Sequence, residues 1–311
     1  MVGNLKGSDL LTLANYAPDD IYQLLAKGLE LKRKRRMGLV EQPLEGRTVA
    51  MIFEKPSTRT RVSFESGVAQ LGGSSIFLGG EDLQLARGET IEDTGAVLSR
   101  YVDAIVLRTF GQDRVEALAA AASVPVINAL SDKYHPCQAL ADLLTVLELK
   151  DRLAGVRIAY VGDGNNVCNS LMIGSAKVGA RIRVAAPKGF EPEASVVEIA
   201  ESIVRSHNEG VLVTNDPAEA VEDADVVYTD VWVSMGQEDE RKKRLAKFGP
   251  FRVDSNLMRR AKRDAIFMHC LPAHRGEEVT AEVIDGARSA VFDQAENRLH
   301  AQKALLAAVL G

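Results

Sequence analysis

The sequence predicts an α/β protein with two domains, each a mostly parallel β-sheet covered by helices, and a ligand site in the interdomain cleft. Short apolar runs of strand length alternate with amphipathic helical patterns along the chain, which is typical of parallel sheets. The 311 residues exceed what one hydrophobic core usually fills. Polar residues follow the predicted strands, where ligands bind in open parallel sheets.

The first half of the chain contains four predicted strands, each followed by a helix or by a loop that leads into one. They cover residues 48–53, 75–78, 104–107 and 124–127. Ahead of them, an amphipathic stretch over residues 20–31 runs into the basic residues 32–36 and then Gly38. This order is typical of a helix C-terminus, where cations face the negative end of the dipole and glycine ends the helix. A long helix over residues 136–150 closes this half.

The second half restarts after residues 151–155 and contains six predicted strands. They cover residues 156–161, 182–186, 211–213, 226–229, 265–268 and 290–292. We therefore predict a first domain over residues 1–150 and a second domain over residues 151–311. A terminal helix is expected over residues 295–310, and it could pack on either domain.

The composition disfavours several classes of protein. Thirty-eight basic and 43 acidic residues give a formal net charge of −5, which offers no basic field for nucleic acid or an anionic membrane. Three cysteines without a Cys-x-x-Cys spacing argue against a disulfide framework and a cysteine-rich zinc module. The longest apolar stretches have strand length, and residues 1–13 lack the order of a signal peptide. We expect a cytoplasmic protein that binds small molecules, with no nucleic acid and no membrane partner.

Three hydroxyl residues and two arginines crowd the turn Ser57-Thr58-Arg59-Thr60-Arg61, between a predicted strand and the next helix. Ser57 or Thr58 is a natural N-cap. A helix N-terminus offers unpaired N–H groups and the positive end of a dipole, so this turn predicts an anion site and not merely a polar cap. Arg59 and Arg61 point to nearly opposite sides of a helix, so only one of them should face the anion.

The turn over residues 162–167, Gly-Asp-Gly-Asn-Asn-Val, resembles a dinucleotide-binding fingerprint after a strand. Val167 occupies the third glycine position, however, and no acidic residue ends the next predicted strand at Ala186. A nicotinamide-dependent dehydrogenase is therefore the weaker alternative. The turn can still place Asn165 and Asn166 at the cleft as neutral hydrogen-bonding groups.

His135-Pro136-Cys137-Gln138 opens the long helix of the first half. Proline is favoured in a first helical turn, which places His135 at or near the cap. A histidine there could polarise a carbonyl group, although a structural role is the common alternative.

His269-Cys270-Leu271-Pro272, with His274 nearby, suggests a metal site because histidine and cysteine are common ligands. Adjacent side chains of an extended segment point to opposite faces, so His269 and Cys270 should not share one ion, and we expect no metal. A reactive thiol at Cys270 is the functional interpretation. A buried, inert cysteine is the alternative.

Four motifs in this order resemble the ornithine carbamoyltransferases, a branch of the aspartate/ornithine carbamoyltransferase family. They are Ser57-Thr58-Arg59-Thr60-Arg61, His135-Pro136-Cys137-Gln138, Asp230-x-x-x-Ser234-Met235-Gly236 and His269-Cys270-Leu271-Pro272. The first two resemble motifs shared by both branches and imply carbamoyl phosphate as a substrate. The last two resemble the ornithine branch, whereas aspartate enzymes typically carry His-Pro-Leu-Pro. The resemblance spans nearly the whole chain.

The resemblance implies a set of substrate contacts. Those to carbamoyl phosphate are Ser57, Thr58, Arg59, Thr60, Gln84, Arg108, His135, Gln138, Cys270, Leu271 and Arg298. Those to ornithine are Asn166, Asp230, Ser234 and Met235, with Asp230 meeting an ammonium group. The implied catalytic residues are Cys270, Arg108, His135 and Asp230. Gln84 would reach the site from a neighbouring subunit, which implies a homotrimer or an assembly of trimers.

The implied reaction transfers the carbamoyl group of carbamoyl phosphate to ornithine and gives citrulline and phosphate, by default in arginine biosynthesis. We expect direct attack of the amine through a tetrahedral intermediate, with Thr60, Arg108 and His135 stabilising the developing oxyanion. Cys270, coupled to Asp230, would take the amine proton. No metal or organic cofactor is expected, since the substrate already carries an activated acyl group.

Residues 233–240 are expected to form a mobile loop that closes over the substrates, because polar and charged residues follow Gly236. Two further alternatives remain at this point. One is a carbamoyltransferase for another amine, such as putrescine or an N-acylated ornithine. The other is a noncatalytic protein that binds an anion or an amino acid.

Overall fold

The computed structural model describes residues 5–80, 83, 88–204, 210–233 and 241–311. The chain forms two compact units, one of residues 1–144 with 297–311 and the other of residues 145–296. The domain boundary near residue 150 stays a prediction, because a compact unit and a functional domain need not end at the same residue. No helix in the described ranges is long and apolar enough to cross a membrane.

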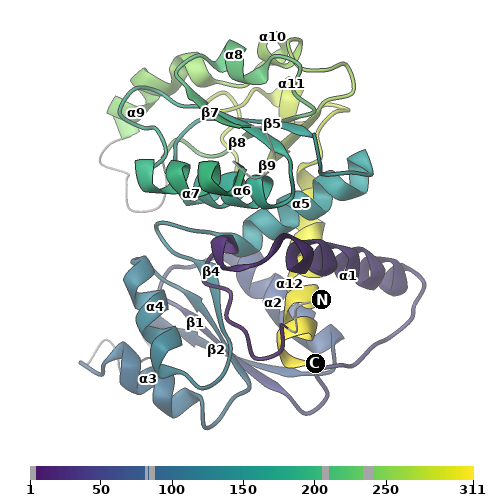
Figure 1. The fold of residues 1–311 in the computed structure, drawn as a ribbon, viewed down its shortest axis with the longest axis vertical. Coiled ribbons are helices and arrows are strands. Elements are labelled where there is room, and N and C mark those ends of the chain that lie inside the picture. Colours follow the sequence, from purple (N-terminus) through teal and green to yellow (C-terminus); the bar gives the residue numbers. More distant parts are fainter. Residues whose placement is uncertain (1–4, 81–82, 84–87, 205–209, 234–240) are drawn as a thin grey trace. The chain divides into compact units, whose positions relative to one another are not determined.

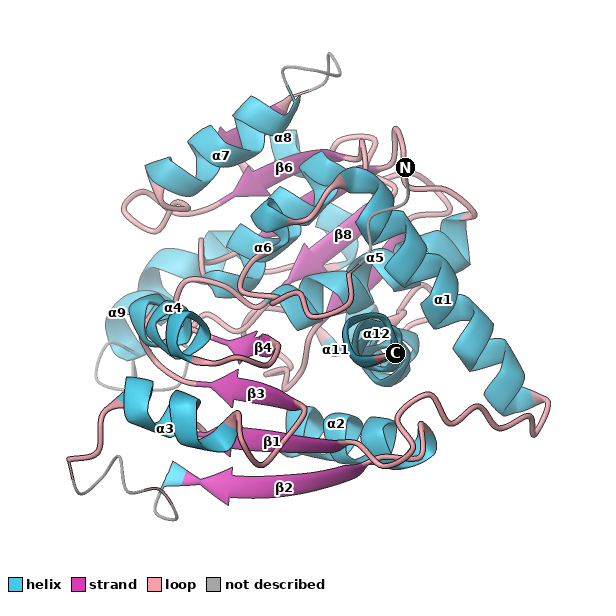
Figure 2. Ribbon diagram, turned by 60° about the horizontal axis from the view of Figure 1, so that its bottom comes forward, coloured by secondary structure: helices cyan, strands magenta, loops and turns pink. Residues whose placement is uncertain are grey.

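The first unit is built on a parallel sheet of four strands in the order β2-β1-β3-β4. The strands are β1 (Thr48–Phe53), β2 (Ser74–Gly79), β3 (Ala104–Arg108) and β4 (Val126–Leu130). Figure 2 shows their arrowheads at the same end of the sheet, so the loops that follow β1, β3 and β4 leave from one edge. This arrangement confirms the predicted α/β class and places the carboxyl ends of the strands together.

Helices cover this sheet because alternate residues of each strand face opposite sides. The helices are α1 (Pro18–Arg36), α2 (Thr58–Gln70), α3 (Ile91–Leu98), α4 (Gln112–Ala121), α5 (Pro136–Lys150) and α12 (Val291–Leu310), with a 3₁₀ turn at Leu13–Asn15. Ile52 and Leu107 lie on the face that packs with Ile91 of α3 and Leu118 of α4. The resulting apolar cluster fixes the sheet from which the site loops extend.

The C-terminal part of α12 packs within the first unit, beside α1 and α2 (Figure 1). Gly67 of α2 allows a close approach, because a Cβ there would lie 3.3 Å from Cγ of Lys303. Gly28 of α1 also lies beside α12, where a Cβ would be at an ordinary contact distance of 3.6 Å from the carbonyl oxygen of His300. A residue near the C-terminus can therefore contribute to a site formed by the first 144 residues.

The second unit contains a parallel sheet of five strands in the order β7-β6-β5-β8-β9. Its strands are β5 (Arg157–Val161), β6 (Arg181–Ala185), β7 (Val211–Thr214), β8 (Val226–Thr229) and β9 (Ile266–His269). Its helices are α6 (Asn166–Lys177), α7 (Ala194–Val204), α8 (Pro217–Val221), α9 (Arg241–Phe248), α10 (Ser255–Met258) and α11 (Ala281–Ile284), with a 3₁₀ turn at Gly249–Phe251. β5 and β8 are neighbours, so the loops that follow them meet at one edge.

The prediction of a sixth strand over residues 290–292 is wrong, because α12 already begins at Val291. The segment before it pairs with β9 only through an isolated bridge between Phe267 and Ser289. Phe292 is 73% exposed, as expected on the outer side of a first helical turn. The strand predicted over 124–127 begins two residues later and ends at Leu130.

Candidate functional site

The turn between β1 and α2 ends with Ser57, which caps the helix and is one of the two predicted N-cap residues. Its backbone is extended (φ −164°), and its Oγ accepts a hydrogen bond from the Thr60 N–H at 3.3 Å. The Ser57 hydroxyl also donates to Oγ1 of Thr60 at 3.0 Å. Thr60 is fully buried, whereas Thr58, the first residue of α2, is exposed. The hydroxyl groups therefore gather where α2 presents its positive dipole end.

The two arginines of this turn have different surroundings, as the helical geometry predicts. Nε of Arg61 donates to Oε1 of Glu65 at 3.0 Å, and its guanidinium lies 3.6 Å from the centroid of the Phe77 ring. Arg61 is thus held at the exposed surface. Arg59 acts instead on His135, whose pKa it helps to lower.

The charges of three guanidinium groups act on His135 in the first unit. Burial lowers the pKa of His135 well below its ordinary value, and the charges of Arg298, Arg108 and Arg59 lower it further. Nη2 of Arg298 donates to Oγ1 of Thr60 at 2.7 Å, which connects α12 to the turn after β1. This cluster favours an anion of high charge and keeps His135 neutral, so that the imidazole can donate a single hydrogen bond.

Gln138 lies in the first turn of α5 and is fully buried. Its Nε2 donates to Oδ1 of Asp142 at 2.8 Å. Its Oε1 has no hydrogen-bond partner in the described part of the chain. A buried acceptor without a donor is costly, so this oxygen is suited to a ligand N–H group.

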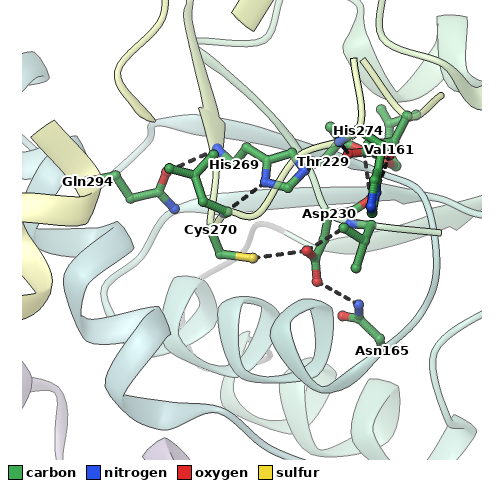
Figure 3. Close-up of polar contacts among 11 residues, drawn as sticks. Val161, Asn165, Thr229, Asp230, His269, Cys270, His274 and Gln294 are labelled. Carbon is green, nitrogen blue, oxygen red and sulfur yellow. Dashed lines mark hydrogen bonds and ion pairs between the residues drawn. The ribbon is translucent and has the colours of Figure 1, made fainter. Parts of the chain in front are cut away.

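The second unit gathers three donors around the carboxylate of Asp230, directly after β8 (Figure 3). Nδ2 of Asn165 donates to Oδ2 at 2.8 Å, and the backbone N–H of Val231 donates to Oδ1 at 2.8 Å. The Cys270 thiol donates to the same Oδ1 at 2.9 Å. The carboxylate is 5% exposed, so the thiol and the carboxylate form one polar group at the edge of the sheet.

The sequence predicts Asn165 only as a neutral group at the cleft, and the structure gives it two specific roles. Its Oδ1 accepts from the N–H groups of Val167 and Cys168 at 3.0 and 3.1 Å, so it is the N-cap of α6. Its amide nitrogen then points to Asp230. Asn166, one of the predicted substrate contacts, is the first residue of α6 and is half-buried.

Arg244 of α9 connects the two loops that carry these groups. Its Nη1 donates to Oδ2 of Asp163 at 2.8 Å and to the carbonyl oxygen of Trp232 at 3.1 Å. The side chains of Arg244 and Asp163 are only 8% and 10% exposed, and the guanidinium lies 4.9 Å from the ring centroid of Phe190. Sequence reasoning missed this pair, because Arg244 belongs to no motif and Asp163 occupies a variable position of the turn over residues 162–167.

His269 ends β9 and is fully buried. Its Nδ1 accepts the N–H of Leu271 at 2.9 Å, so the ring proton lies on Nε2, 3.2 Å from Oε1 of the buried Glu278. These contacts fix the backbone on either side of Cys270. Leu271, another of the predicted substrate contacts, is half-buried.

The prediction that His269 and Cys270 point to opposite faces, and so should not share one ion, is wrong in its geometry. Asp230, His269 and Cys270 each offer a ligand atom within 4.8 Å of the others. β9 ends at His269, so Cys270 lies outside the strand and the alternation of strand side chains does not apply to it. Both nitrogens of His269 and the Cys270 thiol have hydrogen-bonding partners in the protein. The expected absence of a metal stays a prediction.

The structure thus brings the predicted residues together in two groups, one in each unit. The first contains Ser57, Arg59, Thr60, Arg108, His135, Gln138 and Arg298, and the second contains Asn166, Asp230, Cys270 and Leu271. Gln84, Ser234 and Met235 lie outside the described residues, as does most of the loop predicted over residues 233–240.

Comparison with known proteins finds two family models that match successive parts of the chain. Residues 8–148 match the aspartate/ornithine carbamoyltransferase carbamoyl-P binding domain, and residues 154–309 match the aspartate/ornithine carbamoyltransferase Asp/Orn binding domain. The chain is 59% identical to an ornithine carbamoyltransferase of Bacillus subtilis over 307 residues. The alignment covers 99% of this chain and 95% of that protein.

Solved structures are similar over the same length. The ornithine carbamoyltransferase of Pyrococcus furiosus aligns with a TM-score of 0.97 at 55% identity, covering 100% of this chain and 99% of the other. The anabolic ornithine carbamoyltransferase of Campylobacter jejuni aligns with a TM-score of 0.91 at 39% identity, covering 96% and 97%.

Proposed function

We propose that this chain, which belongs to the aspartate/ornithine carbamoyltransferase family, transfers the carbamoyl group of carbamoyl phosphate to ornithine and releases citrulline and phosphate. A single observation carries the proposal. Three guanidinium groups act on His135, and the buried acceptor oxygen of Gln138 belongs to the first turn of α5, which begins directly after His135. Carbamoyl phosphate has a matching group for each of these features. Its dianionic phosphate matches the cations, its carbonyl oxygen matches the neutral imidazole, and its NH₂ group matches the amide oxygen.

Carbamoyl phosphate binds to the first unit in this proposal. Ser57, Thr58, Arg59 and Thr60 hold the phosphate at the N-terminus of α2, which is a natural anion site. Arg108, His135 and Thr60 hold the carbonyl oxygen, and Gln138 accepts from the NH₂ group. Arg298 completes the cation cluster through Thr60. Gln84 of a neighbouring subunit and the backbone at Cys270 and Leu271 are further contacts implied by the family motifs.

Ornithine binds to the second unit in this proposal. Asp230 meets its α-ammonium group, with Asn166, Ser234 and Met235 as the other contacts. The hydrogen bonds from Asn165 and Val231 support this role for Asp230, because they hold its carboxylate at the end of β8. Transfer of the carbamoyl group requires the two half-sites to act on the same pair of substrates.

The reaction begins when the neutral side-chain amine of ornithine attacks the carbamoyl carbon. Negative charge develops on the carbonyl oxygen, where Thr60, Arg108 and His135 stabilise it, about 3 kcal/mol for each well-placed donor. The bond from carbon to the bridging oxygen then breaks, and phosphate leaves with its electron pair towards Arg59. The amine loses its proton to the group formed by Cys270 and Asp230, whose contact of 2.9 Å supports this step.

We further propose a cytoplasmic homotrimer, or an assembly of trimers, that works towards arginine biosynthesis. Gln84 supports the trimer, since the resemblance to the family implies that it contacts carbamoyl phosphate from an adjacent subunit. Cys137, Cys168 and Cys270 form no disulfide, which is consistent with a reducing compartment. The chemistry calls for no cofactor, because the carbamoyl group of its substrate is already activated. Sedimentation velocity would test the assembly.

Citrulline formation from carbamoyl phosphate tests the proposed reaction, with ornithine, aspartate, putrescine and N-acetylornithine supplied in parallel. Turnover selective for ornithine is expected, and Arg59→Ala should lower kcat/KM by about 10²-fold or more. A preference for another amine would overturn the assignment of Asp230 while leaving the carbamoyl phosphate half intact. Tight binding of both ligands without phosphate release would contradict an enzyme.

A further inference from the structure

We propose that Asp142, a residue outside every motif of the sequence, makes the site selective for carbamoyl phosphate over other acyl phosphates by fixing the orientation of the Gln138 amide. The inference rests on the proposed function, since it concerns how that substrate is recognised. Asp142 acts here as a positioning residue, because its contact is with Gln138 and not with the substrate.

Gln138 and Asp142 lie four residues apart on α5, which places them on the same side of the helix. Both side chains are fully buried. Nε2 of Gln138 and Oδ1 of Asp142 are 2.8 Å apart. A carboxylate oxygen only accepts hydrogen bonds, so the amide must turn its NH₂ group towards Asp142. The carboxylate thereby decides which end of the amide faces the remaining space.

That end is the acceptor Oε1, which has no hydrogen-bond partner among the described residues. It lies one helical turn from His135, where the three guanidinium charges act. A flipped amide would instead present a second set of donors beside these cations. Asp142 therefore keeps one acceptor in a site that otherwise contains mainly donors.

The distinction matters because acyl phosphates differ in the group on the acyl carbon. Carbamoyl phosphate carries an NH₂ group, which can donate to Oε1 of Gln138. Acetyl phosphate has the same phosphate and the same carbonyl but carries a methyl group, which would leave the buried oxygen unsatisfied. A site built around a polar contact rejects an analogue that lacks the partner group, because its own polar atom is then left without one.

Binding of two stable analogues measures this selectivity without turnover or ornithine. Phosphonoacetamide carries the NH₂ group, and acetonylphosphonate carries a methyl group in its place. Calorimetry on the intact protein should show tighter binding of phosphonoacetamide by the wild type. Asp142→Leu, whose side chain has the same branched shape and no acceptor, should reduce the ratio of the two affinities by about 10-fold, in the range of one buried hydrogen bond.

Two variants separate positioning from general damage. Asp142→Asn should keep most of the selectivity, because its amide oxygen can still accept from Gln138. Asp103→Leu makes the same change in the same unit before β3, where the carboxylate accepts from the Thr48 N–H at 2.8 Å. This control should lower stability and leave the affinity ratio unchanged. If Asp142→Leu fails to fold, Asp142→Ser carries the test, since its hydroxyl falls short of Gln138.

A double-mutant cycle gives a readout that a purely structural role would not change. In a Gln138→Leu background, Asp142→Leu should cause no further loss of selectivity. The inference is overturned if Asp142→Leu keeps the wild-type ratio, or if its loss adds fully to that of Gln138→Leu. A wild type that forms no citrulline would instead contradict the proposed function, so the two failures are distinguishable.

Discussion

The two half-sites differ in how their polar groups are arranged within the protein. In the first unit, three guanidinium charges act on one imidazole, and the oxygen of Gln138 has no donor among the described residues. In the second unit, the carboxylate of Asp230 already accepts from Asn165, Val231 and Cys270. The first half-site carries an excess of positive charge. The second half-site is a closed hydrogen-bond network, formed within the protein.

This difference shows how each half-site uses binding free energy. A site with excess positive charge gains most when a dianion arrives, so its contribution depends on the ligand. A closed network is stabilised before the ligand arrives, so it contributes orientation at little further cost. Substitutions in the first unit should therefore change affinity for phosphate compounds, whereas those in the second should change the use of ornithine.

Asp230→Asn should have the largest effect, because an amide cannot accept all three donors and cannot help to take the amine proton. We expect kcat/KM for ornithine to fall by about 10²- to 10⁴-fold, the range of general base catalysis. Binding of phosphonoacetamide to the free protein should change by less than about twofold. Steady-state kinetics and calorimetry measure the two quantities. An equal loss in both would show that the half-sites are not separate.

Arg244→Met should have the next largest effect, by breaking the contact between Arg244 and Asp163. A buried carboxylate left without its cation costs about 3–5 kcal/mol of unfolding free energy, which urea unfolding would measure. Arg244 also donates a hydrogen bond to the carbonyl oxygen of Trp232, in the loop that carries Asp230. KM for ornithine should therefore rise, while KM for carbamoyl phosphate changes little. Replacing both residues, by Arg244→Met with Asp163→Leu, should recover much of the stability.

A matched control for Arg244 is the ion pair between Lys262 and Asp225, in which Nζ and Oδ1 are 2.7 Å apart. Asp225 lies before β8, at the opposite end of that strand from Asp230. Lys262→Met should lower stability without changing KM for ornithine. A similar rise in KM for both variants would attribute the effect of Arg244 to stability alone.

The pH dependence of stability should reveal the excess charge of the first unit. The pKa of His135 is lowered in the folded protein by burial and then by Arg298, Arg108 and Arg59, whereas the unfolded chain has the ordinary value of about 6.5. Above that value both states are neutral, so His135 contributes no pH dependence. As pH falls below it, the unfolded chain binds a proton first, and folding is penalised by up to about 1.4 kcal/mol per pH unit.

Urea unfolding at pH 7.5 and 5.5 measures this penalty, with His135→Gln as the comparison. The wild type should lose more stability between the two values than the variant does. Inorganic phosphate should reduce the difference, because an anion among the guanidinium groups removes much of the charge that opposes protonation. Equal losses in both proteins would mean that His135 does not report on the cluster.

Much of the fold was predictable because it depends on local signals. The helix predicted over residues 136–150 is observed at Pro136–Lys150, with proline at its start and Asp151 in the left-handed region (φ 56°) after its end. Ser57 caps α2 because a short side chain before a helical pattern can bond the free N–H groups. The strand predicted over residues 290–292 is wrong, because a short apolar run can be a strand or the start of a helix.

The site was predictable only in part, because some of its contacts join residues far apart in the chain. Asn165 meets Asp230 since β5 and β8 are neighbours in the sheet, and no local pattern reveals that order. Arg244 and Asp163 are joined in the same way. Gln138 belongs to a motif, but its acceptor oxygen depends on Asp142, which reads in sequence as an ordinary helix residue.

Arg61→Ala should have the smallest effect and completes the comparison within one helical turn. Sequence geometry predicts that Arg59 and Arg61 face different sides, and the contacts of Arg61 with Glu65 and Phe77 show which one faces the surface. An exposed ion pair contributes about 1 kcal/mol or less, so the unfolding free energy should change within that limit. KM for carbamoyl phosphate should change by less than about twofold, because the charge of Arg61 is committed outside the cluster on His135.

Arg59→Ala is the matched variant, with the same substitution two residues away and an expected loss of about 10²-fold in kcat/KM. The contrast between the two variants tests whether anion binding comes from specific placement or from positive charge in general. A loss of similar size in both would mean that the whole turn attracts phosphate by charge alone, and the closed network of the second unit would then be the only half-site with defined geometry.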